Sequence, residues 1–103
     1  MIIVTGHAIA REGYQEAMQK LAVEHVERSR AEPGCISHEV SRDVRHSRRF
    51  VFIERWSGMA ALQQHFRLDA SRQFAHSMAQ LSEGSPKMDI YQAEAIRLSL
   101  EPI

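Results

Sequence analysis

Residues 49–56 read RFVFIERW and give the strongest strand signal in the chain. β-Branched and aromatic residues favour strands, and this run places four apolar residues in a row. Alternate residues of a strand point to opposite faces of its sheet. One face therefore carries Phe52 and Trp56, whereas the other carries Val51 and Ile53. The pattern predicts a central strand that is apolar on both faces.

Strand-like and helix-like segments alternate on both sides of this run. A helical stripe with three-and-four spacing begins at Tyr14 and lasts about four turns. Pro33-Gly34 ends it, because the residue before a proline leaves the helical region and glycine permits a left-handed exit. The expected segments are a strand over 2–10, a helix from 14 to 31, a strand over 35–43, a hairpin loop over 42–49, the strand over 49–56, a helix capped by Ser57 over 59–66, a polar break over 67–71, a second helical run to 81 and a strand over 88–98.

This order predicts an α+β, ferredoxin-like βαββαβ fold, with a four-stranded antiparallel sheet and the helices on one face. Helices on one side leave the other face of the sheet uncovered. An apolar face of this width would expose several hundred Å², which monomers rarely do. We therefore expect a homodimer in which the two sheets pack against each other.

Composition narrows the class of protein. The 103 residues suit a single domain spanning residues 1–103, with 44% apolar and 25% charged residues. Thirteen basic residues balance thirteen acidic ones, which argues against a nucleic-acid partner. No apolar run is long enough for a membrane span. The lone Cys35 and the absence of a signal-like N-terminus indicate a cytoplasmic protein.

Three segments together resemble the antibiotic biosynthesis monooxygenase domain family. They are EPGCISHEV at 32–40, FVFIERW at 50–56 and ALQQH at 61–65. The family pattern has a PGC-type turn, a strand ending in E-x-W and a histidine nine residues after the tryptophan. The resemblance covers nearly the whole chain. It implies a dimeric α+β barrel and, in several members, oxidation of quinols or polycyclic phenols by O₂ without a cofactor.

The chain departs from the family pattern at one position. Many members carry a second histidine five residues after the first, where this chain has Ala70. Any role of that second histidine is therefore absent, and the substrate stays open. Haem-degrading members use an asparagine on the first strand, where this chain offers Gly6-His7. The sequence therefore favours the cofactor-free oxidation over haem chemistry.

Cofactor-free oxidation of a phenol requires a base, a donor for the developing oxyanion and walls that exclude water. His65 is the candidate base, because it lies one helical turn after Leu62 and imidazole accepts protons near neutral pH. The indole N–H of Trp56 is the candidate donor to a substrate oxygen. Glu54 shares the strand face of Trp56 and is expected to orient a histidine or to form an ion pair. Plain core packing is the alternative for His65 and Trp56.

Other residues complete the predicted catalytic and binding set. The candidate substrate-binding residues are His7, His38, Phe52, Phe74, His76 and Tyr91. A structural or interface role is the alternative for the strand histidines, and His25 is interpreted as a boundary residue of its helix. No H-x₃-H or C-x₂-C spacing occurs, so no metal site is predicted. No flavin or nicotinamide signature occurs, so no cofactor is predicted.

The sequence thus favours a homodimeric oxygenase that acts on a small aromatic substrate, a quinol or polyphenol, with O₂. Two other functions use the same fold. One is a small-molecule isomerase in which the same histidines shuttle protons, and only oxygen consumption separates it from the oxygenase. The other is a non-catalytic, ligand-binding or stress-associated dimer. Fold alone does not decide between them, because function depends on the site.

Overall fold

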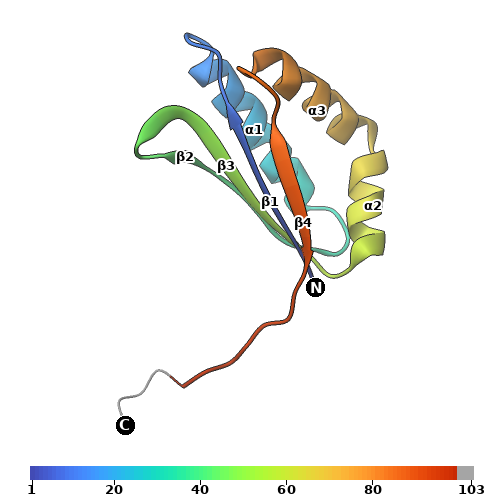
Figure 1. Ribbon diagram of the computed structural model, residues 1–103. Helices are drawn as coiled ribbons and strands as arrows, with labels where there is room; N and C mark the ends of the chain where they lie inside the picture. Colours follow the sequence, from blue (N-terminus) through green and yellow to red (C-terminus); the bar gives the residue numbers. More distant parts are fainter. Residues whose placement is uncertain (100–103) are drawn as a thin grey trace.

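The computed structural model describes residues 1–99 and has seven named elements. They are β1 (Ile2–Ile9), α1 (Gln15–Arg30), β2 (Cys35–Asp43), β3 (His46–Trp56), α2 (Met59–Arg67), α3 (Asp69–Leu81) and β4 (Lys87–Gln92). The strands form one antiparallel sheet in the order β2-β3-β1-β4 (Figure 1). This is the ferredoxin-like α+β fold that the sequence predicts, and the prediction is confirmed.

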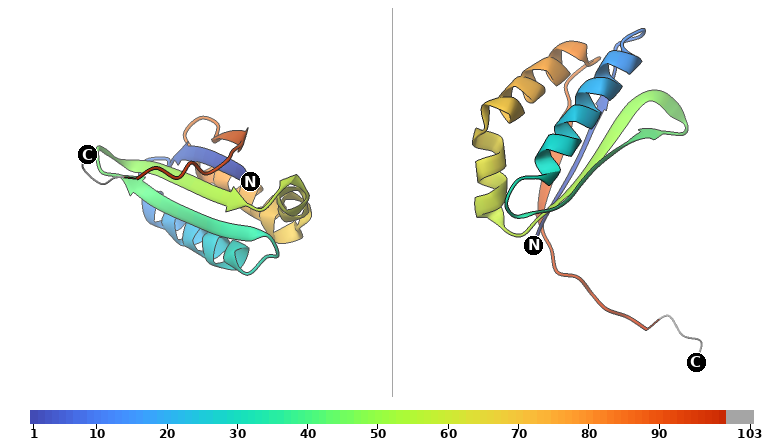
Figure 2. Two further views of the ribbon diagram at one scale, coloured as in Figure 1. Left: turned by 90° about the horizontal axis from the view of Figure 1, so that it is seen from below. Right: turned by 180° about the vertical axis from the view of Figure 1, so that it is seen from behind.

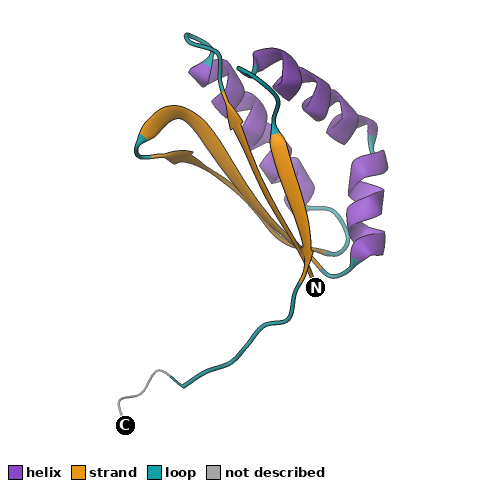
Figure 3. Ribbon diagram, in the orientation of Figure 1, coloured by secondary structure: helices purple, strands orange, loops and turns teal. Residues whose placement is uncertain are grey.

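All three helices lie on one face of the sheet, and the other face is open (Figures 2 and 3). The register places Ala8 opposite Phe50 and Val4 opposite Glu54 on the helix-covered face. Two buried apolar clusters support this layer. One contains Ala8, Ala10, Met18, Ala22, Val26, Phe50, Phe52 and Met78, and the other contains Ile2, Val4, Trp56 and Leu62.

Gly6 marks the part of β1 between these two clusters. A Cβ built on Gly6 would lie 3.1 Å from the Lys87 carbonyl oxygen and 3.9 Å from the Phe52 Cβ. Glycine therefore allows close approach of β4 while filling no space on the helix-covered face. The candidate site lies at this level of the sheet.

The hairpin between β2 and β3 is shorter than the sequence predicts. The expected loop over 42–49 is wrong, because β2 continues to Asp43 and β3 begins at His46. The Asp43 carboxylate accepts hydrogen bonds from the backbone N–H of Arg45 at 2.8 Å and from Arg49 at 3.1 Å. These bonds stabilise a tight turn, and the charged side chains that suggested a loop project from paired strands.

The helical segment after β3 also differs from the prediction. Gly58, not Ser57, is the N-cap of α2, and no side chain caps it. The polar break over 67–71 shrinks to Leu68, whose extended backbone (φ −66°, ψ 138°) separates α2 from α3. Three helices, α1, α2 and α3, therefore cover the sheet. No helix in the described part of the chain has the length and apolar character needed to cross a bilayer.

The last strand ends earlier than predicted. β4 stops at Gln92 instead of continuing to Leu98. Its partner is β1, where Ile2 pairs with Gln92, and the N–H of Ala93 bonds the Met1 carbonyl at 2.9 Å. The paired register of β1 and β4 therefore runs from Ile2–Gln92 to His7–Lys87. The chain then runs away from the sheet, with Ile96 80% exposed (Figure 1).

The open face keeps the apolar groups that motivated the dimer. Ile53 is 48% exposed and Tyr91 is 51% exposed, and register places both on this face with Val51 and Ile3. The dimer itself stays a prediction. We expect light scattering to give twice the chain mass at micromolar concentration. Ile53→Asp should produce monomers, because an unpaired charge buried at the interface costs about 3–5 kcal/mol.

A matched control is Val44→Asp in the hairpin, where the side chain is fully exposed. This variant should keep the wild-type mass. A wild-type monomer at the same concentration, or an Ile53→Asp dimer, would contradict packing through the open face.

Candidate functional site

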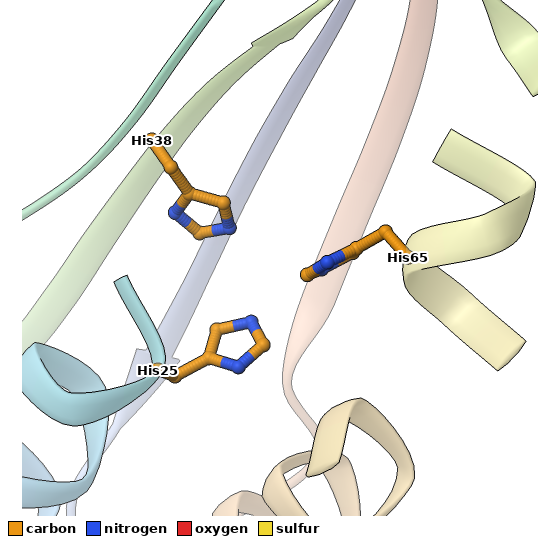
Figure 4. A group of neighbouring side chains, drawn as sticks. All are labelled: His25, His38 and His65. Atoms are coloured by element: carbon orange, nitrogen blue, oxygen red, sulfur yellow. The ribbon is translucent and has the colours of Figure 1, made fainter. Parts of the chain in front are cut away.

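Three histidines from three separate elements meet beneath the helices. His25 comes from α1, His38 from β2 and His65 from α2 (Figure 4). Their ring centroids lie 5.1–5.7 Å from one another. Their exposed fractions are 4%, 0% and 3%, respectively. Such burial is unusual for three titratable side chains and marks this cluster as the candidate site.

His65 is held by a carboxylate from the turn after α1. Its Nδ1 lies 2.9 and 3.1 Å from the two Glu32 carboxylate oxygens, and the Ser71 hydroxyl lies 3.5 Å from the same nitrogen. A carboxylate only accepts hydrogen bonds, so Nδ1 donates to Glu32. In the neutral ring, Nε2 then carries a free lone pair. Glu32 thereby makes His65 a proton acceptor.

The Pro33-Gly34 turn brings Glu32 to this position. Gly34 has φ +82°, and a Cβ there would lie 2.5 Å from the Ala61 Cβ of α2. Only glycine permits this conformation together with such close packing. The N–H of Ser57 also donates to the Gly34 carbonyl oxygen at 2.8 Å. The turn and the start of α2 are therefore locked together, which places Glu32 against His65.

His25 carries the opposite tautomer. A nitrogen of the Arg28 guanidinium lies 3.2 Å from His25 Nδ1. Because a guanidinium can only donate, Nδ1 is the acceptor and the ring proton lies on Nε2. The His25 ring stacks on Phe74 with centroids 3.7 Å apart. Burial, together with the charges of His38, His65 and Arg28, lowers the pKa of His25 to about 3. His25 is therefore a neutral donor at pH 7.

His38 and Glu54 form the third part of the cluster. His38 Nε2 lies 3.3 Å from Glu54 Oε1, but neither ring nitrogen has a well-aligned hydrogen-bond partner among the described residues. Glu54 Oε1 accepts the indole N–H of Trp56 at 2.9 Å. Burial raises the pKa of the Glu54 carboxyl, but His38, Trp56 and His65 outweigh burial and leave the pKa below its usual range. Glu54 is therefore an ionised carboxylate beside His38.

These side chains line a cavity of about 220 Å³ between the sheet and the helices. The remaining wall is mostly apolar and includes Phe52, Phe66, Phe74, Met78 and Met88. Ligand sites are commonly apolar cavities with a few convergent polar groups. The arrangement offers one acceptor nitrogen, one donor nitrogen and a nearby carboxylate to a small molecule.

The structure brings together five of the residues that the sequence singled out. His65, His38, Glu54, Phe52 and Phe74 all line the cavity. Their roles there stay predictions.

Four others are placed differently. The Trp56 ring is fully buried beside His65, and its N–H donates to Glu54 Oε1, so its donation to a substrate stays a prediction. His7 borders the cavity, but register pairs it with Val51 and Lys87 on the open face. The strand alternation likewise puts Tyr91 on the open face. His76 is exposed on α3, two positions from Phe74 and therefore on another side of the helix.

Sequence reasoning missed His25, Glu32 and Ser71. His25 occupies the apolar stripe of α1, and a histidine there is compatible with either a boundary or a site. Glu32 immediately precedes the Pro-Gly turn, from which the sequence predicts only the end of the helix. The Pro-Gly turn itself could have indicated Glu32, because a glycine that permits close packing places its neighbours near another element.

Residues 1–77 match the family described as antibiotic biosynthesis monooxygenase. The chain belongs to this family. A solved structure of a candidate antibiotic biosynthesis monooxygenase from Deinococcus radiodurans is 27% identical, with a TM-score of 0.89 over 96% of this chain and 99% of that one. A structure from Shewanella oneidensis is 28% identical, with a TM-score of 0.82 over 87% of each chain.

An uncharacterized protein of Synechocystis sp. is 31% identical over 91 residues, which are 88% of this chain. The chain spans 62% of the length of that relative. The family resemblance predicted from the three sequence segments is thus confirmed. Membership supports a monooxygenase-like fold and leaves substrate and activity to be proposed.

The low pKa of His25 predicts how stability depends on pH. The unfolded chain protonates His25 near pH 6.5, whereas the folded chain keeps it neutral to about pH 3. The free energy of unfolding is therefore unaffected by His25 above pH 6.5. It decreases as the pH is lowered from 6.5 towards 3, because only the unfolded chain then takes up the proton. The loss should be about 2 kcal/mol between pH 7 and pH 5. Urea unfolding at these two pH values in metal-free buffer measures it.

His25→Phe keeps an aromatic ring against Phe74 and removes the titrating group. Its stability should depend less on pH than that of the wild type over the same range, whereas the exposed His76→Ala control should keep the wild-type dependence. Equal pH dependence in His25→Phe and wild type would contradict the assignment. The two pH values lie above 4.5. Below that pH, protonation of Glu54 in the unfolded chain would also lower the free energy of unfolding, because its pKa is lowered in the folded chain.

Proposed function

We propose that this protein is a homodimeric monooxygenase that oxidises a quinol or polyphenol with O₂ and needs no bound cofactor for that reaction. One observation carries the proposal. Glu32 fixes His65 as a proton acceptor and Arg28 fixes His25 as a proton donor, and both rings line the same apolar cavity. A base and a donor with opposite tautomers suit a phenol that must become a held phenolate.

The reaction balances with O₂ as the only oxidant. His65 Nε2 takes the phenol proton, and the His25 Nε2–H donates to the resulting oxyanion. The quinolate gives one electron to O₂, and the semiquinone and superoxide combine at a ring carbon as a hydroperoxide. The O–O bond then breaks with loss of the C–H proton. One oxygen stays as a carbonyl, and the other leaves as water after taking protons, including the one held by His65. Quinol and O₂ thus give hydroxyquinone and water.

The cavity walls support this chemistry. Phe52 and Phe74 are aromatic and stand edge to face with centroids 6.0 Å apart. Aromatic and thioether side chains bind an aromatic ring and exclude water, which favours electron transfer to O₂ over quenching of the intermediate. The cavity volume of about 220 Å³ suits a small ring system.

Oxygen consumption tests the proposal. A panel of hydroquinones and polyphenols should give O₂ uptake and a hydroxyquinone product in air, with chelator present, and no turnover under nitrogen. Turnover that continues without O₂ would instead identify an isomerase. Tight binding of a panel member with no turnover in air would identify a binding protein. Either result would overturn the oxygenase.

His65→Ala tests the base. It should lower kcat by about 10²–10⁴-fold, because a positioned general base contributes about that factor. Glu32→Gln should lower kcat less, since the amide can still accept from Nδ1–H but cannot stabilise the imidazolium. The His76→Ala control should keep the wild-type rate, and circular dichroism checks that each variant folds. Wild-type turnover by folded His65→Ala would remove His65 from the mechanism.

A further inference from the structure

The histidine cluster has a property that base catalysis does not use. The ligand atoms of His25, His38 and His65 all lie within 4.8 Å of one another, and all three side chains are buried. Each comes from a different element, so the cluster is a product of the tertiary fold. His38 is fully buried, and both of its ring nitrogens lack a well-aligned partner among residues 1–99. Buried polar groups are nearly always paired, and the contact of His38 Nε2 with Glu54 Oε1 at 3.3 Å is poorly aligned, so the ring keeps capacity to bind a ligand.

We propose that His25, His38 and His65 bind one divalent transition-metal ion of the Zn²⁺, Ni²⁺ and Cu²⁺ class, with its open coordination position toward the cavity. Imidazole nitrogen is a ligand that these ions favour. Three protein ligands leave room for a water or a substrate oxygen in the fourth position. The cavity that these histidines line supplies the space for that fourth group.

The residues around the cluster suit a bound cation. Glu32 accepts from His65 Nδ1, which leaves the Nε2 lone pair as the one available to an ion and matches the carboxylate–histidine–metal arrangement. Glu54 lies 3.3 Å from His38 Nε2. Two carboxylates therefore stand beside ligands of the ion, and their two negative charges offset the charge of a divalent cation in this buried place.

Binding requires two adjustments. A tetrahedral ion with bonds of about 2.05 Å sets its nitrogens about 3.3 Å apart, so the rings must move closer than 4.8 Å. His25 must also move its proton from Nε2 to Nδ1, where Arg28 now donates. Arg28 is exposed and can turn into solvent. Arg28 therefore opposes binding, and Arg28→Gln should tighten it, because the amide oxygen can accept the Nδ1 proton.

This inference goes beyond the proposed oxidation and does not depend on it. If the proposed oxidation is also right, the ion inhibits it, since the ion takes the Nε2 lone pair that removes the substrate proton. Zn²⁺ should then lower O₂ uptake, and chelator should restore it. Failure to find a quinol substrate leaves metal binding untouched, and absence of metal binding leaves the oxygen assay untouched.

The test titrates the chelator-treated full chain with Zn²⁺ by calorimetry and with Co²⁺ by visible absorption. We expect one ion per chain. His25→Phe, His38→Phe and His65→Phe should each weaken binding by about 100-fold or more, and Glu32→Gln by about 10–100-fold. Arg28→Gln should bind more tightly than the wild type. His76→Ala removes an exposed histidine and should bind like the wild type.

A second measurement serves if the cluster variants fail to fold. Cu²⁺ bound to the wild type should show superhyperfine splitting from three nitrogens in its electron paramagnetic resonance spectrum. Absence of Zn²⁺ binding at about 1 mM, a concentration that corresponds to a binding free energy of about 4 kcal/mol, would overturn the site. A Cu²⁺ spectrum without these three nitrogen ligands would overturn it as well. Equal affinity of folded His38→Phe and wild type would also overturn it.

Discussion

Contact between the Gly34 turn and helix α2 holds the candidate site together. A side chain at Gly34 would overlap Ala61, and the Ser57 N–H bonds the Gly34 carbonyl. The start of α2 is thus fixed to the start of β2. This contact sets the distance between Glu32 and His65, which lie 33 positions apart in the chain. Movement of α2 by even one side-chain width would separate the two and leave a buried histidine without its carboxylate.

Within the site, three chemically identical rings acquire different properties from their neighbours. His65 is an acceptor because a carboxylate holds its Nδ1, and His25 is a donor because a guanidinium holds the corresponding atom. His38 Nε2 lies 3.3 Å from the Glu54 carboxylate, but neither of its nitrogens has a well-aligned hydrogen bond among the described residues. A single residue type therefore offers an acceptor, a donor and a third ring beside a carboxylate in one cavity. The outer hydrogen bonds, more than the rings, determine what the cavity can do.

The sheet has a different environment on each face. Its helix-covered face holds the core and the cavity, whereas its open face exposes apolar groups such as Ile53 and Tyr91. Edge strand β4 is exposed along its whole length, and Met88 at the cavity wall is 55% exposed. A second chain on the open face would cover the apolar groups without obstructing the helices. The proposed assembly and the proposed chemistry would thus use opposite faces of one sheet.

The sequence by itself determined the order of the elements, the apolar character of both faces of β3 and the family. These features are local: strand alternation, helical spacing and the Pro-Gly stop are set by residues a few positions apart. It also placed His65, Glu54 and Phe52 correctly on the cavity side. It did not place His7, because both faces of β1 carry apolar residues and only the register shows which one the helices cover.

Only the tertiary structure decided that His25, His38 and His65 meet, and that the Trp56 N–H donates to Glu54. Periodicity tells which face of an element a side chain occupies, but not which residue of another element lies opposite. That pairing depends on helix packing and strand register, which arise when the whole core closes. The same limit applies to β4, because its pairing with β1 ends at Gln92 although apolar residues continue to Leu98.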